Sequence, residues 1–264
     1  MDNSIETISL AAVAQLVWPL CRISGFLATM FAVSGNSFPT MARALMCLAI
    51  TVCMLPSIPN LAPDANPFTT IGILITIKES LIGVALGLTT VFISQAFIIA
   101  GQAVAMQTGL GFASLVDPVS GTNSPVVGQF FTVLCTLVFF SLNGHLIFFK
   151  LMLESFTTLP MGQFIPNSSI EEFLYFSGSM FKAGLAMSIS AICTMLVVNF
   201  TLGVMTKAAP QLNIFSLGFA VTMIVGICVL FISLSSFMSN FTNNFNDVFD
   251  EACSLIGTSC NGIL

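Results

Sequence analysis

The chain has 264 residues, of which only six are Lys or Arg and eleven are Asp or Glu. Charged residues therefore make up 6%, against about 25% in average soluble domains, while hydrophobic residues make up 56%. A soluble globule of this size needs a charged surface and a nucleic-acid binder needs a basic one, but the formal net charge here is −5. These values exclude a soluble enzyme, a disordered chain and a nucleic-acid binder, and they predict an integral membrane protein.

Six apolar segments separated by proline-rich and glycine-rich stretches are expected to be helical. They cover residues 5–33, 40–55, 70–108, 126–155, 172–207 and 212–254, within one helical domain over residues 1–264. A helix over the charge-free run 80–116 would be about 55 Å long, whereas a bilayer core is about 30 Å thick. The longest segments must therefore tilt, break or leave the membrane inside a protein shell. The expected fold class is an all-α integral membrane protein with about six long, kinked apolar helices.

Several charged residues lie inside or at the ends of these apolar segments. They are Arg22, Lys78, Glu79, Lys150, Glu154, Lys182 and Lys207. A charge at bilayer depth costs about 2.5–3.5 kcal/mol even on the mildest scale, so we expect these charges to be buried in pairs. Salt bridges within the chain or to neighbouring subunits are one interpretation, and an ion or proton pathway is the other.

The third segment carries a periodic pattern of small residues. Ser80, Gly87, Ser94, Gly101 and Thr108 recur at seven-residue spacing, Gly83 adds a GxxxG motif with Gly87, and Gln95 and Gln102 lie beside the stripe. Small residues allow two helices to approach closely, and glutamine can hydrogen-bond across such a contact. The pattern predicts a helix-packing seam, whose partner helix could belong to this chain or to another one.

An apolar loop is expected between the third and fourth segments, over residues 107–125. Gly109, Gly111 and Gly121 permit unusual backbone angles, and Pro118 and Pro125 prevent a helix from continuing. Its first half is nevertheless apolar, with Leu110, Phe112, Leu115 and Val116. An irregular apolar loop at membrane depth is tolerated only where protein buries it or where it lines a cavity.

The sequence offers no catalytic or metal-binding constellation. His145 is the single histidine, and neither CxxC nor HExxH occurs. We therefore expect no enzyme activity, cofactor or metal, and we interpret Asn143-Gly144-His145 as a helix kink with satisfied polar groups.

The C-terminal tail, residues 240–264, is predicted to be amphipathic and acidic. Its apolar stripe comprises Phe237, Phe241, Phe245, Phe249 and Ala252, and its polar face comprises Asn240, Asn243, Asn244, Asp247, Asp250 and Glu251. Helices that lie on anionic lipid favour Lys and Arg, and this tail has neither. We expect the stripe to dock on protein and the acidic face to be exposed, while Cys253 and Cys260 are free to pair.

Two blocks of motifs, together with looser N-terminal matches, are typical of a known protein family. The first block comprises Gly101-Gln102, Gln107 to Phe112, Asp117 to Gly121, Gly128 to Phe130, Asn143 to His145, and Glu154 to Phe156 with Pro160. The second comprises Asn199, Gly203 to Met205, Ala209 to Asn213 and Phe215 to Phe219. Arg22 to Gly25, Pro39 and Arg43 fit more loosely, and the last twenty or so residues show no such motif.

These motifs resemble the FliR family of flagellar biosynthetic proteins. The resemblance implies a subunit of the export gate of the flagellar type III secretion system. Such a chain would assemble with FliP-like and FliQ-like subunits and an FlhB-like protein, as bent helical hairpins in a hetero-oligomeric helical assembly. Its place would be the bacterial inner membrane at the flagellar basal body, in contact with membrane lipid and with exported, unfolded flagellar proteins.

The resemblance also implies a pore plug in the loop at 107–125. The residues concerned are Leu110, Gly111, Phe112, Leu115, Val116, Asp117 and Pro118. Apolar side chains can exclude water and ions as a hydrophobic constriction does, and the glycines let the loop move aside for a substrate.

Two other functions stay open from the sequence. One is a subunit of the related injectisome export apparatus. The other is a stand-alone secondary transporter or channel, with Asp117, Lys150 and Glu154 as its polar relay, although the chain shows no convincing internal repeat.

Overall fold

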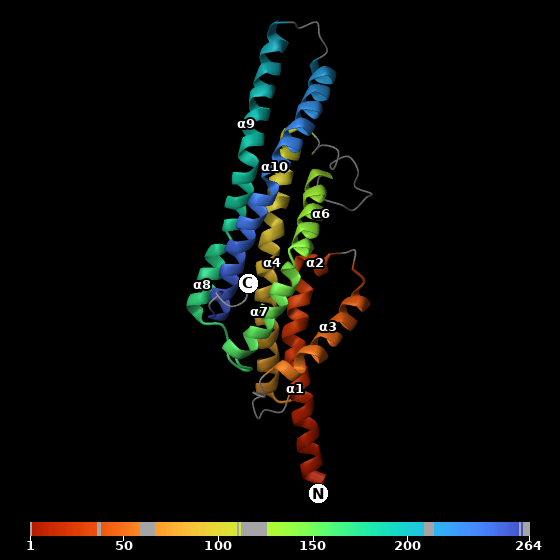
Figure 1. Cartoon of the computed structure of the whole chain (residues 1–264), viewed down its shortest axis with the longest axis vertical. Coiled ribbons are helices and arrows are strands. Elements are labelled where there is room, and N and C mark those ends of the chain that lie inside the picture. The colour runs from red at the N-terminus through yellow and green to blue at the C-terminus, as the bar shows by residue number, and fades with distance from the viewer. Residues whose placement is uncertain are drawn as a thin grey trace. The chain divides into compact units, whose positions relative to one another are not determined.

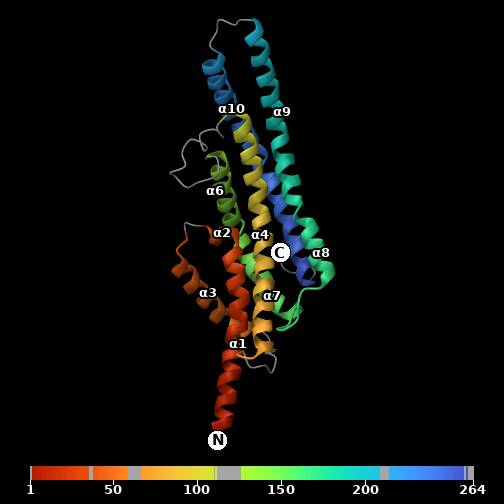
Figure 2. The same ribbon diagram turned by 180° about the vertical axis from the view of Figure 1, so that it is seen from behind.

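Figures 1 and 2 show two views of the computed structural model of the protein. It describes residues 2–35, 38–58, 67–109, 111, 126–208, 214–258 and 260. Every regular element in these ranges is helical. The helices are α1 (Asp2–Thr29), α2 (Phe31–Ser34), α3 (Thr40–Met54), the 3-10 turn η1 (Leu55–Ser57), α4 (Thr70–Gln107), α6 (Val126–Ser141), α7 (Gly144–Thr158), α8 (Asn167–Phe176), α9 (Ser179–Ala208) and α10 (Ile214–Ile256).

The prediction of an all-α integral membrane protein is confirmed. Within the described ranges, four helical stretches are long and apolar enough to cross a membrane, and α6 with α7 forms a bent fifth candidate. The four are Thr40–Ser57, Thr70–Gln107, Asn167–Ala208 and Gly218–Ile256. The six predicted segments correspond to α1–α2, α3, α4, α6–α7, α8–α9 and α10, and three of them are interrupted.

The interruptions occur where the backbone leaves the helical region. Met30 has φ −55° and ψ 119° and separates α1 from α2. Asn143 has φ 55°, a left-handed conformation that asparagine tolerates better than most residues, and separates α6 from α7. A turn at Ser177-Gly178 separates α8 from α9. The predicted kink at Asn143 is therefore present. The expectation of satisfied polar groups there is wrong, because the buried Nδ1 atom of His145 has no hydrogen-bond partner.

The chain divides into two compact units. The first comprises Met1–Phe92, Phe139–Ser177 and Asp247–Leu264, and the second comprises Ile93–Val138 and Gly178–Asn246. The long helices α4 and α10 each contribute residues to both units. The prediction of a single domain over the whole chain stays a prediction.

In the first unit, α1 lies between α3 and the N-terminal part of α4, with α7 beside α4 (Figures 1 and 2). Large aromatic side chains fill this core. Trp18 packs against Ile75, the Phe26 and Phe149 rings are 5.7 Å apart, and the Phe148 ring lies 6.4 Å from that of Phe249 of α10. The core therefore joins the N-terminal helix to the C-terminal end of α10.

In the second unit, α9 and α10 run antiparallel and side by side (Figures 1 and 2). The Phe97 ring of α4 lies 4.7 Å from Phe237 and 5.7 Å from Phe241 of α10, and Phe131 of α6 lies 5.9 Å from Phe237. Only 17% of the apolar window in α8–α9 and 6% of that in α10 is buried within the chain. Most of this hairpin is therefore left for lipid or for other proteins to cover.

Candidate functional site

A buried ion pair stands at the centre of the first unit. The Arg22 Nε atom donates to the Glu79 carboxylate at 2.6 Å, and both side chains are fully buried. This pair joins α1 to α4 and accounts for the two most expensive charges of the predicted set.

Both partners of this pair use their remaining hydrogen-bonding atoms. Arg22 Nη1 donates to the Ser155 carbonyl at 2.8 Å and to its hydroxyl at 3.2 Å, and Nη2 donates to the Leu159 carbonyl at 2.9 Å. The other Glu79 oxygen accepts the Gly162 N–H at 3.1 Å, and the Phe156 ring lies 4.4 Å from the guanidinium carbon. Buried charges are tolerated when they are paired and fully hydrogen-bonded, and this site meets that condition.

The arrangement also caps α7. Arg22 places its positive charge on carbonyl groups of the last helical turn and of the C-cap residue Leu159, where the helix dipole favours a cation. We call Arg22, Glu79, Ser155, Leu159 and Gly162 the polar node. It fixes α1, α4, the end of α7 and the following turn in one geometry.

Of the other predicted buried charges, Lys78 contacts the edge of the polar node and the rest lie outside it. Lys78 donates to the Gly162 carbonyl at 3.4 Å, and Glu154 accepts from the Thr157 hydroxyl at 3.4 Å. Lys150, Lys182 and Lys207 are exposed on the chain itself. Their pairing with charges of neighbouring subunits stays a prediction. Lys182 and Lys207 lie near opposite ends of α9, where a long side chain can reach water at little cost.

The predicted seam on α4 faces helices of the same chain. A Cβ atom at Gly83 would overlap the Arg22 carbonyl, and one at Gly25 of α1 would lie 2.6 Å from the Ser80 carbonyl oxygen. The two backbones therefore touch through glycines from both sides, which aligns Arg22 with Glu79.

The seam continues along α4 toward its C-terminal end. A Cβ atom at Gly87 would overlap Thr29 of α1, and one at Gly101 would lie 3.0 Å from the Gly128 Cα of α6. Ser94 is buried, and Gln95 and Gln102 are half-buried. The sequence left open whether the partner helix belongs to this chain or to another one. For Gly83, Gly87 and Gly101 the partner helices belong to this chain.

The predicted plug residues fall almost entirely outside the described ranges. Leu110, Phe112, Leu115, Val116, Asp117 and Pro118 are not described, whereas Gly111 is buried close to Met106. The described ends are helical on both sides, with α4 ending at Gln107, Gly109 at φ 78°, and α6 beginning at Val126.

The C-terminal stripe is buried against protein within the chain. Phe237, Phe241, Phe245, Phe249 and Ala252 are all buried, and Cys253 forms a disulfide with Cys260. Asp247 and Asp250 are exposed as expected. Glu251 and Asn244 correct the prediction of an exposed polar face, because both are buried. The Asn244 amide donates to the Ile93 carbonyl at 3.3 Å.

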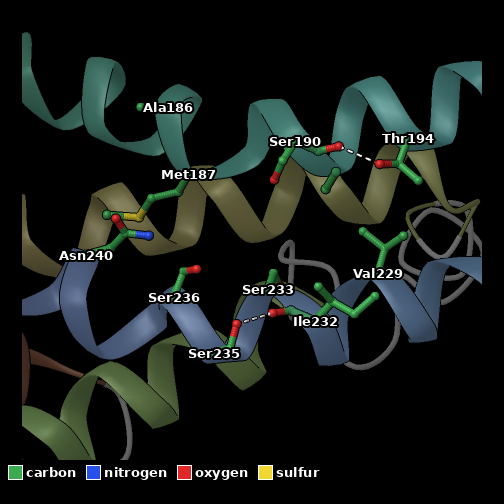
Figure 3. Close-up of a pocket in the computed structure, with 11 residues that line it drawn as sticks. Ala186, Met187, Ser190, Thr194, Val229, Ile232, Ser233, Ser235, Ser236 and Asn240 are labelled. Atoms are coloured by element: carbon green, nitrogen blue, oxygen red, sulfur yellow. Dashed lines mark hydrogen bonds between the residues drawn. The ribbon is translucent and has the colours of Figure 1, made fainter.

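A polar groove that the sequence analysis did not single out lies between α9 and α10. It has a volume of about 410 Å³. Figure 3 shows Ser190 and Thr194 of α9 opposite Ser233 of α10, with Met187 and Asn240 pointing toward each other at one end. The Thr194 hydroxyl donates to the Ser190 carbonyl and that of Ser235 to the Ile232 carbonyl, both at 2.8 Å. The sequence feature that could have indicated this groove is the presence of serine and threonine in the otherwise apolar segments of α9 and α10.

The chemistry of these features is that of packing and recognition. Small and hydroxyl-bearing residues on membrane helices favour close association with another helix. No group of His, Cys, Asp and Glu side chains within the described ranges is suited to hold a metal ion. The polar node joins helices of the first unit, and the groove brings small and hydroxyl-bearing side chains of α9 and α10 together.

Comparison with known proteins gives one consistent result. Residues 13–248 match the family described as "Bacterial export proteins, family 1". The chain is 34% identical over 241 residues to "Flagellar biosynthetic protein FliR" of Escherichia coli (strain K12), covering 90% of this chain and 91% of that protein.

Proteins of the same name from other bacteria give similar matches. The identity is 32% over 246 residues for Pectobacterium carotovorum subsp. carotovorum, covering 92% of this chain and 93% of that protein. It is 28% over 248 residues for Bacillus subtilis (strain 168), covering 90% and 94%. The likeness therefore extends over nearly the whole length of both partners.

Proposed function

This chain belongs to family 1 of the bacterial export proteins, and from that membership we propose that it is a subunit of the flagellar type III secretion export gate. It resides in the bacterial inner membrane at the flagellar basal body and forms part of the protein-conducting pore. The observation that carries this proposal is the match to flagellar export relatives over about nine-tenths of both chains. The flagellar name shared by these relatives favours this role over the injectisome alternative.

The proposed partners are FliP-like and FliQ-like gate subunits and an FlhB-like protein. The α9–α10 hairpin supports an assembled state, because most of its apolar surface is not covered by the chain itself. Its groove adds hydroxyl groups and small side chains to that surface, which favours a protein helix over lipid as the neighbour. The chain acts as a passive conduit component rather than as an enzyme.

Removing the gene from its native host is expected to abolish the appearance of exported flagellar proteins in the medium. A plasmid copy of the chain should restore them. The same cells yield the second measurement, in which a tagged copy is extracted with detergent and its companions are identified. Several small membrane proteins in one large particle are expected, whereas a monomer or dimer together with normal export from the deletion strain would refute the proposal.

The plug is the finer part of the proposal. Residues 107–125 connect α4 to α6 and contain the apolar set Leu110, Phe112, Leu115 and Val116 among glycines and prolines. Such a loop can close an idle pore with apolar side chains that exclude water and ions. Its glycines allow it to swing aside when an unfolded substrate enters.

Deleting residues 110–116 is expected to leave a complex that assembles but leaks. The deletion removes the apolar seal and keeps Asp117 to Pro125 as a connection between the helices. Small-solute permeability or conductance would be measured in cells with the full complex and no export substrate. The control replaces Gly121 and Thr122 with alanine, outside the apolar set. A deletion complex that assembles and stays as tight as the parent would show that the loop is not a plug.

A further inference from the structure

A cluster of acidic residues that the proposed function does not explain lies where α8 is beside the C-terminal end of α10. Figures 1 and 2 both show these two segments side by side. Five of the chain's eleven acidic residues lie on them, namely Glu171, Glu172, Asp247, Asp250 and Glu251, and neither segment contains Lys or Arg. After Lys207 the chain has no basic residue at all.

Glu251 is the most buried member of this group. Its side chain is only 8% exposed, and its Oε1 atom is buried without a hydrogen-bond partner. The neighbouring charge is of the same sign, because the Glu172 carboxylate on α8 is close enough for the two to repel. Within the described part of the chain, Glu251 forms no ion pair.

The helix itself gives these carboxylates no compensation. The C-terminal end of a helix carries the negative pole of its dipole and favours cations, and Asp250 and Glu251 lie in the penultimate turn before the end of α10 at Ile256. A buried carboxylate without a cation is strongly unfavourable unless it is paired and hydrogen-bonded. The contrast with Glu79 is direct, because that carboxylate has Arg22 and the Gly162 N–H.

We infer that Glu251 and Glu172 receive a basic side chain, lysine or arginine, from a neighbouring subunit of the assembly. This inference rests on the proposed function, since it requires that neighbours exist. A long side chain can reach a carboxylate that is nine-tenths buried, and its ammonium or guanidinium group supplies several donors to the two carboxylates. A phospholipid amine is the competing cation, and the experiment below distinguishes the two.

The test compares dissociation rates of detergent-purified complexes that carry the parental chain or a variant. Glu251→Gln keeps the size of the side chain and removes its charge, and we expect its complex to lose neighbouring subunits at least about tenfold faster. Asp250→Asn removes an exposed charge on the adjacent residue and is expected to behave as the parent. Accumulation of each variant in the membrane is measured first, so that a folding defect is recognised.

Each outcome has a definite meaning. Failure of the parental chain to purify with any neighbour refutes the proposed function, whereas a stable parental complex with an unchanged Glu251→Gln rate refutes only this inference. If Glu251→Gln does not accumulate, the dissociation rate is measured with Glu172→Gln instead. Glu172 is exposed, so this substitution leaves the packing of the core unchanged. A parental rate from that variant overturns the inference. Loss of bound phospholipid from Glu251→Gln without faster subunit dissociation also overturns it.

Discussion

Replacing Glu79 with alanine is expected to lower the free energy of unfolding by about 3–5 kcal/mol. The change leaves the Arg22 guanidinium fully buried without its carboxylate and leaves the Gly162 N–H without an acceptor. The measurement is chemical unfolding of the purified chain in detergent, followed by fluorescence. Trp18 is the single tryptophan, it is fully buried, and it lies one helical turn before Arg22, so its emission reports on this unit.

Two further variants distinguish the contribution of the paired charges to stability from that of side-chain packing at the site. The double variant Arg22→Met with Glu79→Leu leaves no buried charge, and we expect it to lose less stability than Glu79→Ala. It stays below the parent, because the Gly162 N–H and the Leu159 carbonyl lose their partners. Lys182→Ala removes an exposed charge and serves as the matched single-residue control. A Glu79→Ala chain as stable as Lys182→Ala would show that the polar node contributes little to the fold.

Replacing Phe241 with alanine is expected to cost about 3–5 kcal/mol of stability. Phe241 is fully buried, and its ring lies 5.7 Å from that of Phe97 and 6.2 Å from that of Phe245. Its loss opens a cavity between α10 and α4 in the second unit. The midpoint of thermal aggregation in detergent would be recorded, and a decrease of about 10 °C is expected for a chain of this size.

Phe231→Ala provides the control for this experiment. Phe231 lies on the same helix and is 77% exposed, so its truncation removes an equal volume without opening a cavity. Similar midpoints for the two variants would contradict the burial of the C-terminal stripe against protein.

Much of the helical fold follows from the sequence because its physical causes are local. Apolar length defines the helices, and proline and glycine define their ends. The pairing of charges was also predictable in kind, since burying Arg22 without a partner is too costly. The identity of the partner was not, because the choice of Glu79 over Glu154 depends on how closely α1 and α4 approach through Gly25 and Gly83.

The wrong assignment of Glu251 and the missed groove have a common cause. The sequence of a single helix does not reveal which other helices pack on it. Glu251 follows the polar spacing of α10, yet it sits at the edge of the stripe next to Ala252, on the side where α8 lies. Lys182 and Lys207 are exposed on the chain because α9 has little of its surface covered within it, so their predicted pairing requires neighbouring subunits. The groove between α9 and α10 likewise exists only once the two helices are placed together.

The polar node has a consequence for how the chain is made. Its members are 57 and 133 to 137 residues apart in sequence. At a synthesis rate of about 5–20 residues per second, Glu79 follows Arg22 from the ribosome after roughly 3–11 s, and Leu159 follows after roughly 7–27 s. The first helix therefore leaves the ribosome with its guanidinium unpaired, and until the later residues are made water or the insertion machinery has to solvate it. The polar node can be completed only after Gly162 has been synthesised.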